Sequence, residues 1–480
     1  MSRLEGGNGV HVRKFLKIGG IVLSVILFII AIAGGLVYAM IRHFYPSPPQ
    51  ASYIKPKDDP LEAQRQDLDY FAKLLAMDRS YSARARAGAQ GRLAELTDLK
   101  AVLPRPNFRV ALMEIAALSD NGHTRVDSDS GADPMELRVR VAAFSDGIYV
   151  MHATQAYADL LGGKLVSIDG HPIDGVMARL EQLRGGTPQW RKTNALVYIT
   201  WQDVLVGAGI APDMGHSTWT VISPSGATVT RTLTPYKPSD DEPDIFVNRI
   251  YSNEPLKALG ADWVAYQPDR SLPITLSDFD TTFRRVRLPG SCVMLIQFKS
   301  NDDVGNDRIM PFEAATKADM KANQPCELIV DNRFNDGGNL TKSVFFSNAL
   351  PDLIAPSGHI YLLTSGMTFS AGITTTALVK HAGGQRVTIL GEPVGDRLAF
   401  FAEGGRGCLP NYPLCLHYED GKHDYGHSCT DVDNCFWLNW LLPVRVNTLQ
   451  PDETITMSFG DWRQGHDPVF ERAMALANRN

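Results

Sequence analysis

The sequence predicts a membrane-anchored α/β protein whose soluble part combines a helical segment, a β-rich insert and an α/β core. Three observations predict this organisation. Residues 18–41 carry no charged side chain and are long enough to cross a bilayer as a helix. Short β runs dominate residues 134–236. After Leu288, short continuous apolar strands alternate with helical segments, which is typical of buried parallel strands.

Length and composition indicate a folded protein of several domains. The chain has 480 residues, which exceeds the usual size of a single hydrophobic core and predicts two or three domains. Apolar residues make up 44% and charged residues 21%, a globular composition. The net charge of −6 is mild and no basic stripe with interleaved aromatic residues is present. These features exclude nucleic-acid-binding proteins.

The apolar segment Ile18–Ile41 is predicted to be a transmembrane anchor. Basic residues precede it, at Arg3, Arg13, Lys14 and Lys17, whereas only Arg42 follows closely. The positive-inside rule therefore places residues 1–17 in the cytoplasm and the rest outside it, in the periplasm if the source is a Gram-negative bacterium. A cleaved signal peptide is the alternative, since Val37–Ala39 offers small residues for cleavage, although the apolar run exceeds a signal core. The Pro-rich residues 42–59 predict a spacer that holds the soluble part off the membrane.

Residues 60–133 are predicted to form a helical N-terminal part of the soluble region. Apolar residues recur there at helical spacing, at Leu68, Phe71, Leu74 and Leu75. A second helix is expected from Phe108 to Leu118, with a stop at Ser119–Gly122, where Asn-Gly supplies the turn. His123 follows at once. A residue on such a turn is expected to be exposed yet held by the scaffold, as catalytic groups often are.

Residues 134–238 are predicted to form a separate β-rich module. Within Leu161–Asp174 a Gly-Gly turn precedes an alternating strand at Lys164–Ile168 and an Asp-Gly turn, and a helix is expected from about Gly175 to Leu183. This order resembles a PDZ domain, which implies a groove that takes up an extended peptide beside a sheet edge. A structural β insertion without a groove is the alternative.

Residues 239–480 are predicted to form the α/β core. Four short apolar segments are typical of buried parallel strands, at Val293–Phe298, Glu327–Asp331, His359–Leu363 and Val387–Leu390. A helix is expected at Ser370–His381, between the last two strands. A strand, a serine-bearing turn and a helix in this order can position a nucleophile.

Two segments of the core carry residues suited to hydrolytic chemistry. Gly337 and Gly338 follow the strand that ends at Asp331, and adjacent glycines leave backbone N–H groups able to approach a ligand, as an oxyanion hole requires. Ser370 opens a helix, where free N–H groups and the helix dipole favour a developing negative charge. Taken alone, Ser370 would be interpreted as an N-cap residue.

The order of these motifs resembles the tail-specific, or C-terminal processing, serine proteases and their tricorn-core and retinoid-binding-protein-like relatives. The D-x-R-x-N-x-G-G motif begins at Asp331, and Thr368–Ala371 reads TFSA, like the nucleophile segment of the family. Pro451-Asp452 and Asp467–Val469 look like the closing strand and helix of the family. The resemblance implies a ClpP-like, or crotonase-like, α/β core.

The resemblance also implies roles for individual residues. Ser370 would be the nucleophile, and the backbone N–H groups of the oxyanion hole would come from Gly337, Gly338 and Ala371. One branch of the family uses a Lys base about twenty-five residues after the serine, but this segment reads GEPVGDRL and offers no Lys.

In the tricorn-like branch of the family, the base is a His that precedes the PDZ insert. His123 occupies this position, and an imidazole titrates near neutral pH, so it can accept the serine proton and return it to the leaving group. A third group should orient the imidazole. The acid of the family is not evident, because Arg445 falls near its expected place, and Glu392 and Asp396 are the substitute candidates.

The cysteines indicate disulfides in an oxidising compartment. Four of them crowd one segment, namely Cys408, Cys415, Cys429 and Cys435, and are predicted to form two disulfides. A zinc site with His417, His423 or His427 and a calcium loop at Asp431–Asn434 are the alternatives, but neither has the required spacing. Cys292 and Cys326 are either a pair or free thiols. The insert 404–437 is interpreted as a disulfide-stapled flap beside the active site.

The predicted function is that of a serine-type peptidase that acts on extended or C-terminal polypeptide segments outside the cytoplasm. The mechanism requires no metal and no organic cofactor. Two alternatives use the same fold: an inactive, membrane-tethered peptide-binding homologue, and an esterase that uses the same serine. The sequence leaves the oligomeric state and the physiological substrate open.

Overall fold

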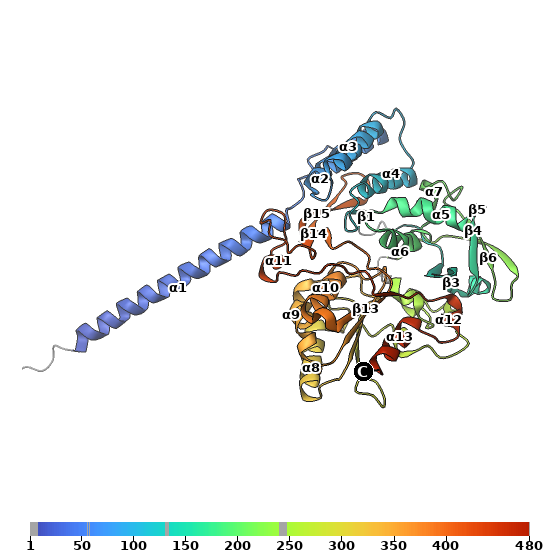
Figure 1. Ribbon diagram of the computed structural model, residues 1–480. Coiled ribbons are helices and arrows are strands. Elements are labelled where there is room, and N and C mark those ends of the chain that lie inside the picture. The colour runs from blue at the N-terminus through green and yellow to red at the C-terminus, as the bar shows by residue number, and fades with distance from the viewer. Residues whose placement is uncertain (1–7, 55, 57, 130–133, 240–246, 480) are drawn as a thin grey trace, which may run out of the picture.

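The computed structural model describes residues 8–54, 56, 58–129, 134–239 and 247–479. The first residues of the predicted cytoplasmic segment, and residues next to both predicted boundaries of the β-rich module, lie outside this part of the chain. The described residues form a mixed α/β body from which one long helix projects (Figure 1). The predicted α/β class is confirmed.

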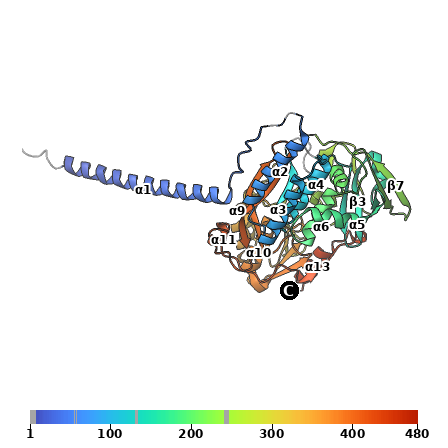
Figure 2. The ribbon, with the colours of Figure 1, turned by 90° about the horizontal axis from the view of Figure 1, so that it is seen from above.

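Helix α1 (Asn8–Phe44) leaves the body as a single rod in both views (Figure 1, Figure 2). Its segment Ile21–Phe44 is long and apolar enough to cross a membrane, and the side chains of residues 21–39 are exposed rather than packed inside the protein. Because nothing in the body covers these apolar side chains, another apolar environment is required for them.

The Pro-rich segment after α1 is not a free spacer, which corrects the prediction. Phe44 is 1% exposed, and the Tyr45 hydroxyl donates a hydrogen bond to Glu403. The next residues serve as acceptors, since the Tyr418 hydroxyl donates to the Pro46 carbonyl at 2.6 Å and the Tyr70 hydroxyl to the Pro49 carbonyl at 2.7 Å. A proline residue has no backbone N–H donor but keeps its carbonyl acceptor, so this segment can bind to the body through its carbonyl groups.

Three helices follow, as predicted: α2 (Pro60–Met77), α3 (Ala83–Thr97) and α4 (Arg105–Ala117). The Asp59 side chain caps α2 and the Ser82 side chain caps α3, because each accepts a hydrogen bond from a backbone N–H of the first turn. Helix α4 ends just before the turn that carries His123.

The β-rich module predicted at residues 134–238, called the insert below, contains a seven-stranded sheet and three helices. The main path runs through β2 (Val139–Phe144), β3 (Gly147–Thr154), β4 (Lys164–Ile168), β6 (Ser217–Ile222) and β7 (Thr228–Leu233), with β5 (His171–Pro172) on β4 and β8 (Trp263–Ala265) on β3. The helices are α5 (Ile173–Leu180), α6 (Pro188–Tyr198) and α7 (Gln202–Gly207). The predicted strand at Lys164–Ile168 is β4 itself. The sheet takes β8 from beyond residue 238, so it extends past the predicted boundary.

The core is a six-stranded sheet with the order β16-β13-β12-β11-β10-β9. Its strands are β9 (Phe283–Arg287), β10 (Met294–Phe298), β11 (Leu328–Asp331), β12 (Ile360–Thr364), β13 (Val387–Gly391) and β16 (Glu453–Thr454). All neighbouring pairs are parallel except β9 with β10. The four predicted strands are therefore confirmed, including their parallel arrangement.

Helices cover both faces of this sheet. They are α8 (Ile309–Ala322), α9 (Leu340–Ala349), α10 (Ala371–Gly383), α11 (Leu438–Leu441), α12 (Phe459–Arg463) and α13 (Pro468–Ala477). Met294 and Ile296 of β10 share a hydrophobic cluster with α8, α9 and α10, whereas Leu295 between them shares a cluster with α13. Alternate residues of a strand point to opposite faces, so both faces of β10 are buried.

The Cys-rich insert belongs to a sheet rather than to a free flap. Strands β14 (Ala399–Cys408) and β15 (Leu414–Asp424) form a hairpin, and β1 (Arg125–Ser128) pairs with β15 on its other side. Two disulfides, Cys408–Cys415 and Cys429–Cys435, confirm the predicted number and give the pairing that the sequence left open, and Cys292–Cys326 is a third. The zinc alternative is wrong, because these cysteines are bonded to one another.

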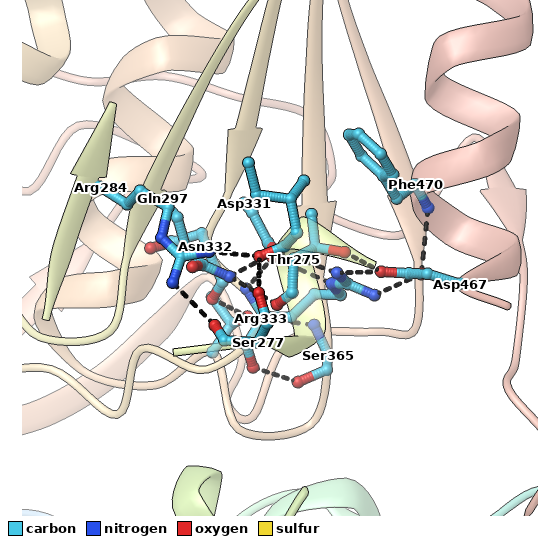
Figure 3. A network of polar contacts seen from close by, with 12 residues as sticks. Thr275, Ser277, Arg284, Gln297, Asp331, Asn332, Arg333, Ser365, Asp467 and Phe470 are labelled. Carbon is cyan, nitrogen blue, oxygen red and sulfur yellow. Dashed lines mark hydrogen bonds and ion pairs between the residues drawn. The ribbon is translucent and has the colours of Figure 1, made fainter. Parts of the chain in front are cut away.

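The charged side chains at the end of β11 have a structural role that Figure 3 shows. Arg333 donates to both oxygens of Asp331, at 2.9 Å, and to both oxygens of Asp467, at 2.7 and 2.8 Å. Asp467 also caps α13 by accepting from the Phe470 N–H. The motif therefore attaches the C-terminal helix to the end of the central strand.

An isolated buried acid on α8 gives the first testable prediction. Glu313 is 6% exposed, one of its carboxylate oxygens has no partner among the described residues, and burial raises its pKa to about 8. Because the folded state binds this proton more tightly than the unfolded state does, stability should fall as the pH rises from about 4.5 to 8. Glu313→Gln is expected to raise the Tm by ~2 °C or more at pH ~8.5 and to leave it unchanged at pH ~4.

Thermal unfolding followed by circular dichroism checks this prediction. Glu95→Gln is the control, because Glu95 is exposed on α3 and its replacement should not change the Tm at either pH. A Glu313→Gln protein with the Tm of the wild type at pH ~8.5 would contradict the prediction.

Candidate active site

Ser370 lies on a strained turn between β12 and α10. Its backbone has φ 52° and ψ −123°, a conformation that non-glycine residues rarely adopt. The residue occupies the N-cap position of α10, but its side chain makes no capping hydrogen bond and has no other hydrogen-bond partner within the described chain. The N-cap interpretation therefore does not account for the serine, and its hydroxyl is available.

Hydrogen bonds to the motif after β11 hold this turn in place. The Phe369 N–H donates to the Asn335 carbonyl at 2.9 Å, and the Thr368 hydroxyl donates to the Asn332 carbonyl at 2.8 Å. The Ser365 hydroxyl donates to the Arg333 carbonyl. Both ends of the turn are thus bonded to one loop, which can stabilise the strained backbone of Ser370.

Gly337 lies directly against Ser370. A Cβ atom at Gly337 would lie 2.6 Å from the Ser370 Cβ, 3.1 Å from its Oγ and 3.2 Å from the Ala371 nitrogen. With a φ of +118° as well, only glycine fits this position. The structure therefore brings Ser370, Gly337 and Ala371 together, as the sequence predicted.

The two predicted N–H groups differ in their present partners. The Ala371 N–H, at the first residue of α10, has no acceptor among the described residues, whereas the Gly337 N–H donates to the Asn335 Oδ1 at 3.0 Å. Gly338 packs against the backbone of Asn301 and Asp302 instead of Ser370. The candidate oxyanion hole is therefore restricted to Gly337 and Ala371.

A buried asparagine network fixes Gly337. Asn335 donates to the side-chain oxygens of Asn301 and Asn332, both at 2.8 Å, and the Asn301 N–H donates to the Gly337 carbonyl. Asn332 in turn donates to the Gly372 carbonyl of α10 at 2.7 Å. Sequence reasoning missed Asn301 and Asn332. Their only signal was a polar residue close to the end of a buried strand, since Asn332 directly follows β11 and Asn301 is the third residue after β10.

His123 is half-buried and both of its ring nitrogens are buried, which corrects the predicted exposed turn. Its ring lies in a column of aromatic rings, between Phe369 with centroids 4.4 Å apart and Phe400 with centroids 5.3 Å apart. Trp190 extends the column beyond Phe369, and His423 extends it beyond Phe400. The cause is β14, whose Phe400 covers the turn from a position far along the chain.

The imidazole of His123 is not engaged with Ser370 in this structure. Both ring nitrogens are buried and have no hydrogen-bond partner among the described residues. Burial, with the charges of His423, Arg125 and Arg184, holds the pKa of His123 well below its usual value. The imidazole is therefore neutral at pH 7, which is the state that a general base requires.

The structure separates the two candidate acids. Asp396 is buried, its Oδ2 has no partner, and a Cβ atom at Gly122 would lie 3.0 Å from this oxygen. Glu392 is exposed and lines a cavity with Lys192 and Arg333. Asp396 therefore lies against the turn that carries His123, and burial raises its pKa to about 6.

A series of polar contacts connects α10 to the end of α1. The Thr374 and Tyr425 hydroxyls are 2.6 Å apart, and the Tyr425 hydroxyl is 3.2 Å from the His423 Nδ1. The His423 Nε2 lies 3.4 Å from Glu403, which accepts the hydrogen bond of Tyr45. The junction after α1 thus reaches the helix that begins beside Ser370.

A cavity of about 420 Å³ lies between the insert and the core, next to the serine turn. Its walls come from Gly366 and Met367 of the turn, from Lys192 and Leu196 of α6, and from Phe144 of β2, with further residues of the core. Apolar walls with a few charged groups at this size are typical of ligand sites.

The fold resembles that of mature CPAF. The structure of mature CPAF complexed with lactacystin has a TM-score of 0.55 at 14% sequence identity, over 88% of this chain and 100% of CPAF. The photosystem II D1 C-terminal processing protease has a TM-score of 0.35 at 13% identity, over 74% of this chain and 87% of that protein.

The tricorn protease has a TM-score of 0.37 at 14% identity, over 88% of this chain and 37% of that protein. No protein-family model matches the sequence, and no curated protein does. The predicted resemblance to the C-terminal processing proteases is thus confirmed in the fold, and the likeness to CPAF carries it.

Proposed function

We propose that this protein is a serine-type peptidase with Ser370 as its nucleophile. One observation carries the proposal: the Ser370 hydroxyl is unbonded on a strained strand-to-helix turn and lies between Gly337 and the free N–H of Ala371. Strain at a single serine, beside N–H groups at a helix start, is what acyl transfer requires. The CPAF fold supports the same reading.

In the proposed mechanism, Ser370 Oγ attacks a peptide carbonyl and its proton passes to His123. The negative carbonyl oxygen is stabilised by the N–H groups of Ala371 and Gly337, the latter released from or shared with Asn335. His123 then protonates the leaving amine, which leaves an acyl-enzyme. A water molecule gives a proton to His123 and attacks the acyl carbon, and Ser370 recovers its proton as the ester bond breaks.

This cycle requires a movement of His123, because its nitrogens are buried and unbonded in the described conformation. We propose that the ring moves between Phe369 and Phe400 so that one nitrogen faces Ser370 and the other faces the unpartnered oxygen of Asp396. We therefore propose Asp396 as the group that orients the base, in preference to Glu392.

We propose that the substrate is an extended polypeptide that enters between the insert and the core. The cavity next to Met367 supports this, because it lies beside the serine turn and is formed by both parts of the protein. The order of β4, β5 and α5 supports a PDZ-like insert. Its Gly162–Gly163 turn packs against Tyr266 and Val221, so the cavity, and not this turn, is the proposed entry site.

We also propose that α1 anchors the protein in a membrane, with the peptidase outside the cytoplasm. The exposed apolar segment Ile21–Phe44 supports the anchor, and the three disulfides support an oxidising compartment. The basic residues before the segment support a cytoplasmic N-terminus.

Active-site labelling of the detergent-solubilised full chain by a fluorophosphonate tests the proposal. The full chain is needed because Phe44 and Tyr45 pack onto the body. Labelling is expected in the wild type and in Ser225→Ala, and it should be lost in Ser370→Ala and in His123→Ala with unchanged circular dichroism. Ser225 is the control, since its hydroxyl is exposed between β6 and β7 and, among the described residues, contacts only Ser223.

The outcomes distinguish the candidate functions. Phe400→Ala removes the ring that covers the His123 turn. The peptidase proposal would be overturned by labelling that survives in Ser370→Ala, or by labelling that is missing both from the wild type and from Phe400→Ala. The disengaged His123 favours the second candidate, a peptide-binding homologue without catalysis. Turnover of esters but not of peptides by a labelled protein would favour the esterase.

A further inference from the structure

The end of the anchor helix and α11 form one apolar cluster. The ring of Phe44, the last residue of α1, lies 5.5 Å from Phe436 and 6.1 Å from Trp440 between centroids. Met40, one turn earlier, packs against the same hydrophobic cluster as Leu442. The helix therefore reaches the body at α11 without an intervening linker, and both views show α11 beside this end of α1 (Figure 1, Figure 2).

Next to this junction, α11 exposes apolar side chains. Trp440 is 40% exposed and Leu441 is 67% exposed. The segment is held firmly, because the Cys429–Cys435 disulfide precedes it and its Leu438 and Leu442 line a small cavity together with Val344 of α9. A fixed pair of exposed apolar residues is thus continuous with the apolar surface of α1.

The length of the anchor places this pair at the membrane interface. The segment Ile21–Phe44 has 24 residues, which corresponds to about 36 Å of helix, whereas a bilayer core is about 30 Å thick. The last turn of α1 therefore reaches the headgroup region, and α11 is docked there. Tryptophan side chains favour this region, because their rings are apolar and their N–H group can still find a polar partner.

We propose that Trp440 and Leu441 form a membrane-seating surface that inserts into the lipid interface beside the anchor. The proposal rests on the proposed anchoring by α1. Lipid is the occupant, because the patch is continuous with a helix whose apolar side chains face no protein. Val432 is excluded from this surface even though it is exposed, since Asp431 and Asp433 beside it are also exposed.

Insertion of this surface into the lipid interface would fix the orientation of the soluble body relative to the membrane. Leu438 and Leu442 of α11 and Leu378 of α10 line the same small cavity, and α10 begins beside Ser370. A protease attached by one flexible tether would sample many orientations, whereas two contacts with the bilayer hold its site at one height. Substrates would then be segments at a set distance from the membrane.

Site-specific photocrosslinking tests the proposal. The full chain, with p-benzoylphenylalanine in place of Leu441, is incorporated into nanodiscs of phosphatidylcholine and phosphatidylglycerol, irradiated and analysed by mass spectrometry. Ile222, 43% exposed on β6 on the far side of the body from α1, receives the same replacement as the control. Lipid adducts are expected at least ~10-fold more often at position 441 than at position 222.

Resistance to extraction by alkaline carbonate, measured on the same proteins in cell membranes, separates the two proposals. Retention of the protein in the membrane without an excess of lipid adducts at position 441 would overturn the proposed seating surface and leave the proposed anchor intact. Covalent dimers at position 441 would overturn it in favour of contact with a second copy. Loss of retention would overturn the anchor and the seating surface together.

Discussion

Replacing Asp396 with Asn is expected to reduce kcat/KM for peptide hydrolysis by about 10³- to 10⁴-fold, a loss typical of removing the charge that orients a catalytic imidazole. The carboxylate is buried against the His123 turn with one oxygen unpartnered, so it can accept the second N–H of the imidazole when the ring engages Ser370. An amide of the same shape has no negative charge to stabilise the imidazolium.

The pH profile separates this role from a merely structural one. Burial raises the pKa of Asp396 to about 6, so wild-type kcat/KM should fall on the acid side near pH 6, and this limb should be absent in Asp396→Asn. The raised pKa also means that the charged carboxylate costs stability as the pH rises from about 4 to 6, so the variant should be at least as stable as the wild type at pH ~7.5.

Glu392→Gln is the matched control, because Glu392 follows the same strand but lines the cavity instead of the His123 turn. In Glu392→Gln, the fall of kcat/KM on the acid side should remain near the pH at which it occurs in the wild type. An Asp396→Asn enzyme within tenfold of the wild type, or one with an unchanged acid limb, would show that another group orients the base.

The framework of the core could be predicted because its signals are local. Strands β10 to β13 lie within a residue of their predicted bounds, since each is a short apolar run buried on both faces. The juxtaposition of Gly337 with Ser370 also follows from local rules, because both lie in the loops after parallel neighbouring strands, whose ends meet at one edge of the sheet.

The environment of His123 could not be predicted from its own segment. Its burial depends on Phe400 and Phe369, which lie in β14 and in the serine turn, and no pattern around residue 123 encodes those contacts. The same holds for Phe44, whose partners Phe436 and Trp440 lie near the other end of the chain. A Pro-rich composition indicates an extended backbone but not whether the body binds it.

The D-x-R-x-N-x-G-G motif shows where resemblance is informative and where geometry is needed. Resemblance associates the whole motif with catalysis, yet of its two glycines only Gly337 lies against Ser370. Asn335 positions Gly337 through its side-chain oxygen, and Arg333 joins strand β11 to α13. The motif thus combines one position beside the proposed nucleophile with positions that hold the loop.

Arg333→Met is expected to destabilise the fold by about 3–5 kcal/mol, the usual cost of removing one partner from a buried ion pair. Asp331 and Asp467 are both fully buried and share this single guanidinium, which is 5% exposed. Burial alone would raise the pKa of Asp467, but Arg333 outweighs it and holds the pKa below its usual value. Without the arginine, two carboxylates would face each other in a site without water.

Urea unfolding of the full chain at pH ~7 measures this cost. Asp467 has a depressed pKa in the folded state, so its contribution to stability is present above the unfolded pKa of 3.8 and is lost as the pH falls below it. The difference in the free energy of unfolding between the variant and the wild type should therefore become smaller on acidification. Arg472→Met is the matched control. Its pair with Glu453 is also bidentate, at 2.7 Å, but is partly exposed, so its loss should lower the free energy of unfolding much less than the loss of Arg333 does. Equal losses in the two variants would mean that the network shown in Figure 3 does not hold α13 on the sheet.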